Sequence, residues 1–108
     1  MIISNTFSFG MLDAFPVAIE VEEVTLNQAA DLASREKIVS CINHEPTARV
    51  FSDMLGVPIS PDRQSIALKP GDRFLIGQYK GPRLQDSDRT LPEGAKIKWL
   101  LASVYGWD

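Results

Sequence analysis

The sequence is poor in the residues that build disulfides, metal centres and membrane spans. Its 108 residues include one cysteine, Cys41, and one histidine, His44. A single cysteine excludes an internal disulfide and is typical of a cytoplasmic protein, and these two residues are too few for a zinc site. No run of 18 apolar residues is present, so we expect no transmembrane helix. The first residues lack the basic stretch of a signal peptide.

Runs of basic residues and nucleotide-binding glycine motifs are also absent. Without a cluster of Lys and Arg, binding to a long nucleic acid is not expected, and neither a GxGxxG nor a P-loop motif occurs. The charge is uneven along the chain: residues 1–36 hold six acidic and one basic residue, whereas residues 44–108 hold nine basic and eight acidic residues. A small anionic ligand held by a few arginines therefore remains compatible with the sequence.

The composition is that of one folded domain. Hydrophobic residues are 44% of the chain and charged residues 23%, which are ordinary values for a globular protein. At this length we expect a single domain over residues 1–108.

Hydrophobic patterning predicts an α/β fold with a five-stranded mixed sheet flanked by helices. A helix over 26–39 is indicated by Thr25 and Gln28, which form a capping box. The helix that starts at 43–47 has Pro46 in its first turn and Gly56 at its end. A short helix over 9–15 is expected after Ser8. Strands are expected over 1–4, 17–22, 64–68, 73–79 and 96–105, with 64–68 and 73–79 paired as a hairpin.

Three polar positions are candidates for chemistry. His44 precedes a predicted helix, where it serves either as a capping residue or as a general acid or base, because histidine titrates near neutrality. Arg83 lies in a polar connection of fourteen residues, 81–94, and connections of this length are often functional. Its guanidinium suits a phosphate, but a surface ion pair with Asp86 or Asp88 is the alternative. Arg63 has the same two interpretations.

Several segments, in the same order along the chain, resemble a known family. Residues 5–16 resemble its motif Asn-x-Phe-Ser-x-x-Met-Leu-x-x-Phe-Pro, and residues 42–47 resemble its Ile-Gly-His-x-x-Thr helix start. Arg63, then the Gly71-Asp72 pair, then Gln78 with Arg83-Leu84 follow in the family's order. The chain is similar over nearly its whole length to the viral anti-CRISPR ring nucleases, a group first seen as small archaeal virus proteins.

The resemblance implies a homodimer with a ligand cavity across its interface. The implied ligand is cyclic tetra-adenylate, the second messenger of type III CRISPR defence, and the implied reaction is metal-independent cleavage to linear di-adenylate with a 2′,3′-cyclic phosphate. By position, the resemblance implies a general acid at His44, stabilisation of phosphate charge by Arg83, and a third catalytic-site position at Asp86. It implies ligand-pocket positions at Asn5, Ser8, Thr47, Arg63 and Gln78.

The sequence departs from the family pattern near the loop arginine. Asp86 stands where the family often has glutamate, and Glu93 is an alternative for that carboxylate. Asn43 replaces the glycine before the histidine. Binding of the cyclic nucleotide without cleavage, or a viral interaction protein without a small ligand, are therefore the alternative functions.

Overall fold

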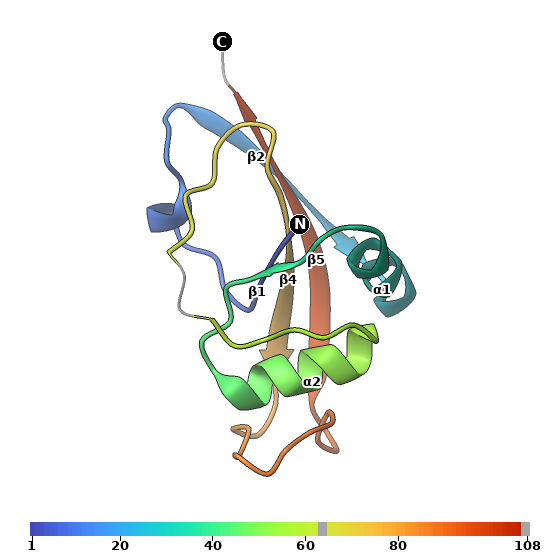
Figure 1. The fold of residues 1–108 in the computed structure, drawn as a ribbon. Helices are drawn as coiled ribbons and strands as arrows, with labels where there is room; N and C mark the ends of the chain where they lie inside the picture. The colour runs from blue at the N-terminus through green and yellow to red at the C-terminus, as the bar shows by residue number, and fades with distance from the viewer. Residues whose placement is uncertain (63–64, 107–108) are drawn as a thin grey trace.

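One mixed β-sheet organises the fold. The computed structural model describes residues 1–62 and 65–106, and in them five strands lie in the order β2-β5-β4-β1-β3 (Figure 1). The strands β2, β5 and β4 pair antiparallel, whereas β4, β1 and β3 pair parallel. The strand bounds are Ile2–Ser4 for β1, Val17–Val24 for β2, Val39–Ser40 for β3, Arg73–Lys80 for β4 and Lys96–Gly106 for β5. The predicted α/β fold with a five-stranded mixed sheet is confirmed.

The two α-helices begin at the predicted caps. In α1 (Leu26–Arg35) the Thr25 hydroxyl accepts from the Gln28 amide at 3.1 Å, and Gln28 Oε1 accepts from the Thr25 amide at 2.8 Å. The helix α2 (Glu45–Leu55) has His44 at its N-cap, proline in its first turn, and Gly56 with a φ of 73° at its end. Glycine suits that left-handed position because it has no Cβ.

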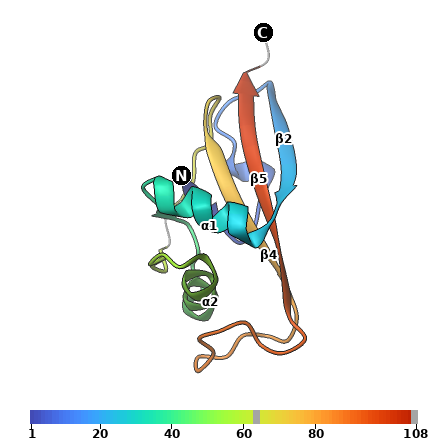
Figure 2. The ribbon, with the colours of Figure 1, turned by 90° about the vertical axis from the view of Figure 1, so that its right-hand side faces the viewer.

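The two faces of the sheet are covered differently. Both α-helices pack on one face (Figure 2), where Phe51 and Leu55 of α2 meet Leu75 and Trp99 of the sheet. On the other face Phe7 and Leu12 of the N-terminal segment pack against Phe74. This segment includes a 3₁₀ helix, η1 (Phe9–Met11). The second face has no α-helix on it in the described residues, and it stays more open.

The strand predicted at 64–68, and its hairpin with 73–79, are wrong. Residues 65–67 belong to no strand, Leu68 makes only an isolated bridge to Leu12, and residue 64 lies outside the described residues. The strand β4 already has two neighbours, β5 and β1, so neither of its edges is left for residues 64–68. The turn at 69–72 does form, with the Asp72 amide donating to the Lys69 carbonyl at 3.0 Å.

Two helices are shorter than predicted, and the strand β3 was missed. The helix expected over 26–39 ends at Arg35, and Val39–Ser40 instead forms β3, which pairs with β1. The helix expected over 9–15 is the three-residue η1. The helix ends at Met11 because the chain pairs there with Leu68, whose amide donates to the Met11 carbonyl at 2.6 Å.

Among the described helices, none is long and apolar enough to cross a membrane.

Candidate functional site

Three chain segments meet at one end of the sheet because three of its strands run parallel. Neighbouring parallel strands bring their carboxyl ends to the same edge, which is where ligands bind in many α/β proteins. The segment after β1 begins at Asn5, the segment after β3 leads to His44, and the connection after β4 carries Arg83. The sequence places polar residues at each of these ends, so the edge gathers the candidate chemistry.

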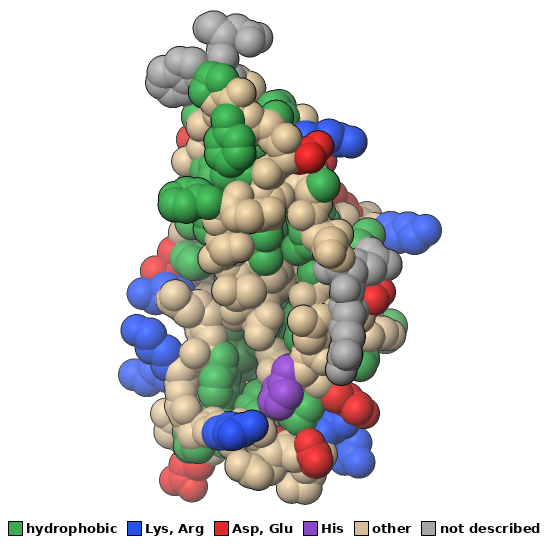
Figure 3. All heavy atoms as spheres, turned by 90° about the vertical axis from the view of Figure 1, so that its left-hand side faces the viewer, with side chains coloured by type: hydrophobic (Ala, Val, Ile, Leu, Met, Phe, Trp, Pro, Cys, Tyr) green, Lys and Arg blue, Asp and Glu red, His purple; other side chains and the backbone are tan. Residues whose placement is uncertain are grey.

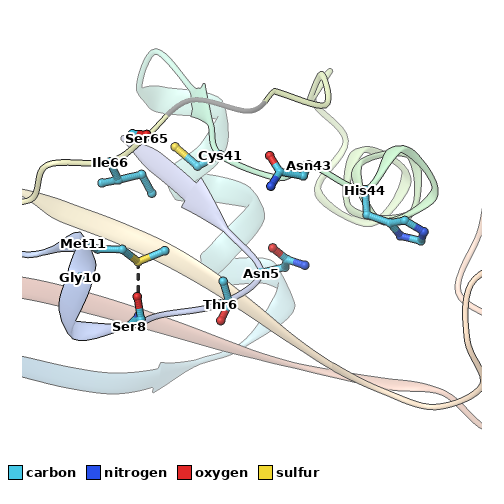
Figure 4. A pocket seen from close by; sticks show the side chains of 10 residues that line it. All are labelled: Asn5, Thr6, Ser8, Gly10, Met11, Cys41, Asn43, His44, Ser65 and Ile66. Carbon is cyan, nitrogen blue, oxygen red and sulfur yellow. Dashed lines mark hydrogen bonds between the residues drawn. The ribbon is translucent and has the colours of Figure 1, made fainter.

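A hollow of about 560 Å³ lies between the first two segments. This volume is in the usual range of about 300–1,000 Å³ for small-molecule sites. Figure 4 shows that Asn5 and Asn43 lie on opposite sides of this hollow, with His44 at one end of its lining residues. The lining residues come from residues 5–11, from the β3–α2 connection and from the chain after the undescribed residues: Asn5, Thr6, Ser8, Gly10, Met11, Cys41, Asn43, His44, Ser65 and Ile66.

A second hollow, of about 280 Å³, lies on the other side of His44. It is lined by His44 together with Arg83, Leu84, Gln85 and Asp86 of the β4–β5 connection. Because His44 lines both hollows, they adjoin at its side chain. Figure 3 shows the histidine at the surface of this face, with charged side chains gathered at the same end of the molecule. His44 therefore stands between the two hollows.

A hydrogen bond to Thr47, in the first turn of α2, sets the orientation of the His44 ring. Its Nδ1 lies 2.8 Å from the hydroxyl oxygen of Thr47, whose side chain is buried with 6% exposure. His44 itself is exposed, and its side chain makes no capping bond to the helix backbone. With Nδ1 held by Thr47, Nε2 is the ring nitrogen left to face a ligand.

The turn that presents Asn5 is held by a buried serine. Ser4 is fully buried, its hydroxyl donates to the Thr6 carbonyl at 2.8 Å, and its oxygen accepts from the Thr6 amide at 3.2 Å. Asn5 lies between these two residues and is exposed. The side chain of Ser4 thus closes a local turn that leaves the Asn5 amide beside the hollow.

The candidate site residues differ in where they lie relative to the two hollows. Asn5 and Ser8 line the larger hollow, Arg83 and Asp86 line the smaller one, and His44 lines both. Thr47 lies behind the histidine as its hydrogen-bond partner. Gln78 is exposed on β4 and Glu93 is exposed in the β4–β5 connection, and neither lines these two hollows. Arg63 lies outside the described residues. Of the two candidate carboxylates, Asp86 shares the smaller hollow with His44, whereas Glu93 lines neither hollow.

Cys41 lines the larger hollow but is a poor partner for His44 in nucleophilic catalysis. Burial raises the pKa of the Cys41 thiol above its usual value, and the negative charge of Asp62 raises it further. A raised pKa keeps the thiol protonated at neutral pH, whereas the thiolate is the reactive form.

No set of three His, Cys, Asp or Glu side chains suited to a metal ion occurs in residues 1–62 and 65–106.

Two residues of this region were missed at the sequence level. Asn43 lines the larger hollow directly after β3, and that strand was itself unpredicted. Arg49 lies on α2 one turn after Glu45, and its guanidinium contacts the β4–β5 connection. The spacing of Glu45 and Arg49 was a visible signal for an ion pair, but the contact with a loop 37 residues away has no local signature.

The comparisons with known proteins point to viruses of archaea. Residues 1–97 match the model of the family described as STIV B116-like. A segment of 57 residues is 33% identical to Uncharacterized protein 26 of Sulfolobus islandicus filamentous virus (isolate Iceland/Hveragerdi). It covers 53% of this chain and 48% of that protein, so the match spans about half the length of this relative.

A solved structure has the same fold. B116 of Sulfolobus turreted icosahedral virus superimposes with a TM-score of 0.79 over 94% of this chain and 97% of that one. The two sequences are 22% identical in this comparison.

Proposed function

This chain belongs to the STIV B116-like family of archaeal virus proteins, and on that premise we propose that it is a ring nuclease that cleaves cyclic tetra-adenylate. The observation that carries the proposal is the position of His44, which lines two adjoining hollows with Arg83 on the wall of the smaller one. A proton donor and a guanidinium around one space are the two groups that cleavage of a phosphodiester by its own ribose requires.

The proposed reaction is an internal displacement at phosphorus. The ribose 2′-oxygen attacks the adjacent phosphate, the bond from phosphorus to the 5′-oxygen breaks, and a 2′,3′-cyclic phosphate forms. The 2′-hydroxyl loses its proton to water, the departing 5′-oxygen gains one from His44 Nε2, and His44 takes up a proton from solvent before the next turnover. In the charged imidazole, Nδ1–H donates to the Thr47 hydroxyl, which keeps Nε2–H directed at the ligand. Arg83 stabilises the negative charge that grows on the phosphate oxygens.

The polar residues of the larger hollow suit the rest of a nucleotide. Asn5 and Asn43 offer amide donors and acceptors on opposite sides of it, and Ser8 adds a hydroxyl. These groups match ribose hydroxyls, phosphate oxygens and the edge of a base. Two cuts at opposite phosphates of the four-phosphate ring give two molecules of linear di-adenylate. Because the ring repeats itself, a homodimer that presents each set of residues twice matches its symmetry.

The proposed setting is the cytoplasm, which is that of the host cell if a virus encodes the chain. Cyclic tetra-adenylate activates the nucleases of type III CRISPR defence, and its removal there silences the response. The ligand is a small cyclic nucleotide, and neither a membrane nor a long nucleic acid takes part in the proposal.

Incubation of the protein with labelled cyclic tetra-adenylate in EDTA tests this function. We expect linear di-adenylate with a 2′,3′-cyclic phosphate, identified by mass spectrometry. Retention of the intact ring would instead establish a sequestering protein, and neither binding nor product would leave a protein that acts through other partners. Cyclic hexa-adenylate, as a second substrate in the same assay, reports the ring size that the site accepts.

A further inference from the structure

Arg49 links the helix that carries His44 to the loop that carries Arg83. Its Nη1 lies 2.9 Å from Glu45 Oε1, its Nε donates to the Asp88 carbonyl at 3.3 Å, and its Nη2 donates to the Asp86 carbonyl. The guanidinium thus holds one carboxylate on its own helix and two carbonyls of the β4–β5 connection. In Figure 1 this connection, drawn in orange, passes below α2.

The part of the loop that Arg49 holds is a compact unit. The Gln85 amide donates to Asp88 Oδ2 at 2.7 Å, and the Asp88 amide donates to the Gln85 carbonyl at 2.9 Å. Leu84, just before this turn, is buried with 6% exposure. Because the turn is closed on itself, two contacts to its carbonyls are enough to fix its position against α2.

This contact differs from an ordinary surface ion pair. The Arg49 side chain is 24% exposed, whereas that of Arg35, which pairs with Asp31 at the same helical spacing on α1, is 74% exposed. Exposed ion pairs contribute little to stability. A half-buried guanidinium with three partners instead directs several N–H donors of its planar group at them. Lysine cannot reproduce this arrangement, because its ammonium group is a single point of charge.

We propose that Arg49 is a positioning residue that sets the distance between His44 and the Arg83–Asp86 wall of the smaller hollow. This role rests on the proposed function, since it concerns the same site. Arg49 lines neither hollow, so it acts through the loop and without touching the ligand. A misplacement of about 1 Å in catalytic groups is enough to lower a rate by about 100-fold.

The test compares Arg49→Gln and Arg49→Lys with Arg35→Gln. The control removes an arginine from the same pairing, with an acid four residues earlier, but leaves the loop untouched. We expect amide hydrogen exchange in residues 84–89 to rise at least tenfold in both Arg49 variants and to stay unchanged in the control. Single-turnover cleavage is expected to fall about 10–100-fold in both Arg49 variants, at ring concentrations that saturate the enzyme.

The two readouts separate this inference from the proposed function. Hydrogen exchange needs no substrate, so unchanged exchange in Arg49→Gln overturns the positioning role whatever the protein cleaves. If exchange rises but the saturated cleavage rate matches that of wild type, the loop is held without consequence for chemistry, and the role is overturned again. Full recovery by Arg49→Lys would mean that charge alone matters, which also contradicts the proposal. If wild type cleaves no ring, the proposed function fails, and the exchange data still decide whether Arg49 holds the loop.

Discussion

At the scale of single residues, the contact between Thr47 and His44 occupies Nδ1 and leaves Nε2 for the proposed ligand. The hydroxyl of Thr47 lies 2.8 Å from Nδ1, and the threonine is buried in the first turn of α2. A helix start of the form His-x-x-Thr thus gives the histidine a fixed orientation without a second strand or loop. The sequence motif pointed to both residues, but only the structure separates their parts: His44 faces the hollows, and Thr47 lies behind it.

Replacement of His44 by alanine is expected to abolish cleavage and leave ring binding within a few-fold of wild type. Loss of a general acid lowers a rate by about 10²–10⁴, whereas the contacts of Asn5, Ser8 and Arg83 to the ligand remain. Single-turnover assays give the rate, and isothermal titration gives the affinity. Thr47→Val keeps the imidazole but loses its partner, so its rate should fall between wild type and His44→Ala. An unchanged rate in His44→Ala would remove this residue from the mechanism.

Arg83→Ala should weaken both binding and cleavage, and Asp86→Ala should do less. A guanidinium contacts the phosphate in the ground state and gains further as charge develops in the transition state. Asp86 is exposed on the wall of the same hollow as Arg83, and we expect this carboxylate to orient the arginine rather than to transfer a proton. Glu93→Ala serves as the control, because that carboxylate lies outside the hollow. Equal damage from Arg83→Ala and Asp86→Ala would assign Asp86 a direct catalytic part.

At the scale of elements, local signals predicted the helix starts, and long-range pairing decided the strands. Thr25 and Gln28 cap α1 through contacts within three residues, so the sequence was sufficient there. The two-residue strand β3 has no pattern of its own and exists because β1 offers it an edge. The residues around Ile66 were predicted as a strand from their local sequence pattern alone, but β4 had no free edge with which they could pair. The hollow beside His44 depends on β3, so its lining at Asn43 could not be predicted.

The packing of α2 on the sheet depends on one glycine of β4. A Cβ at Gly77 would lie 2.6 Å from Phe51 Cε2 and 2.8 Å from Trp99 Cζ3, and these two rings pack edge to face with centroids 5.0 Å apart. Gly77→Ala is therefore expected to lower the free energy of unfolding by about 1–3 kcal/mol, the usual cost of overpacking. Chemical denaturation measures this change. In Gly106→Ala the nearest atoms lie 3.7 Å away, so that variant should unfold close to wild type; equal stability of the two would contradict the packing argument.

At the scale of the whole molecule, the proposed dimer has a suitable surface. On the sheet face without α-helices, an apolar hollow of about 170 Å³ is lined by Phe7, Val21, Phe74 and neighbouring apolar residues, and Val21 is 54% exposed. This small apolar hollow, with Val21 at the surface beside it, is the candidate for the contact between the two copies. Phe7 stands between Thr6 and Ser8, which line the larger candidate hollow. A second copy on this surface would therefore lie next to the site.

Light scattering at micromolar concentration should give a dimer, and Val21→Lys should shift it toward the monomer. A lysine in this position buries a charge against the partner, which is costly without an opposite charge. Val39→Lys is the matched control, because Val39 is 39% exposed on the opposite edge strand, β3. Titration of His44→Ala with cyclic tetra-adenylate should give one ring per two chains. A monomeric wild type, or one ring per chain, would overturn the shared site.

Each catalytic set should belong to a single chain of that dimer, since His44 and Arg83 line the same hollow of one chain. This makes the outcome of mixing two inactive variants predictable. A heterodimer of His44→Ala and Arg83→Ala has one half without the acid and one half without the guanidinium, so neither half is complete. Co-expression with two different tags and tandem purification isolates this heterodimer, and we expect no cleavage above that of the two homodimers. A heterodimer of wild type with His44→Ala retains one intact half and should cut the ring once, releasing linear tetra-adenylate before any di-adenylate. Recovery of cleavage in the doubly defective heterodimer would instead require that His44 of one chain works with the arginine of the other.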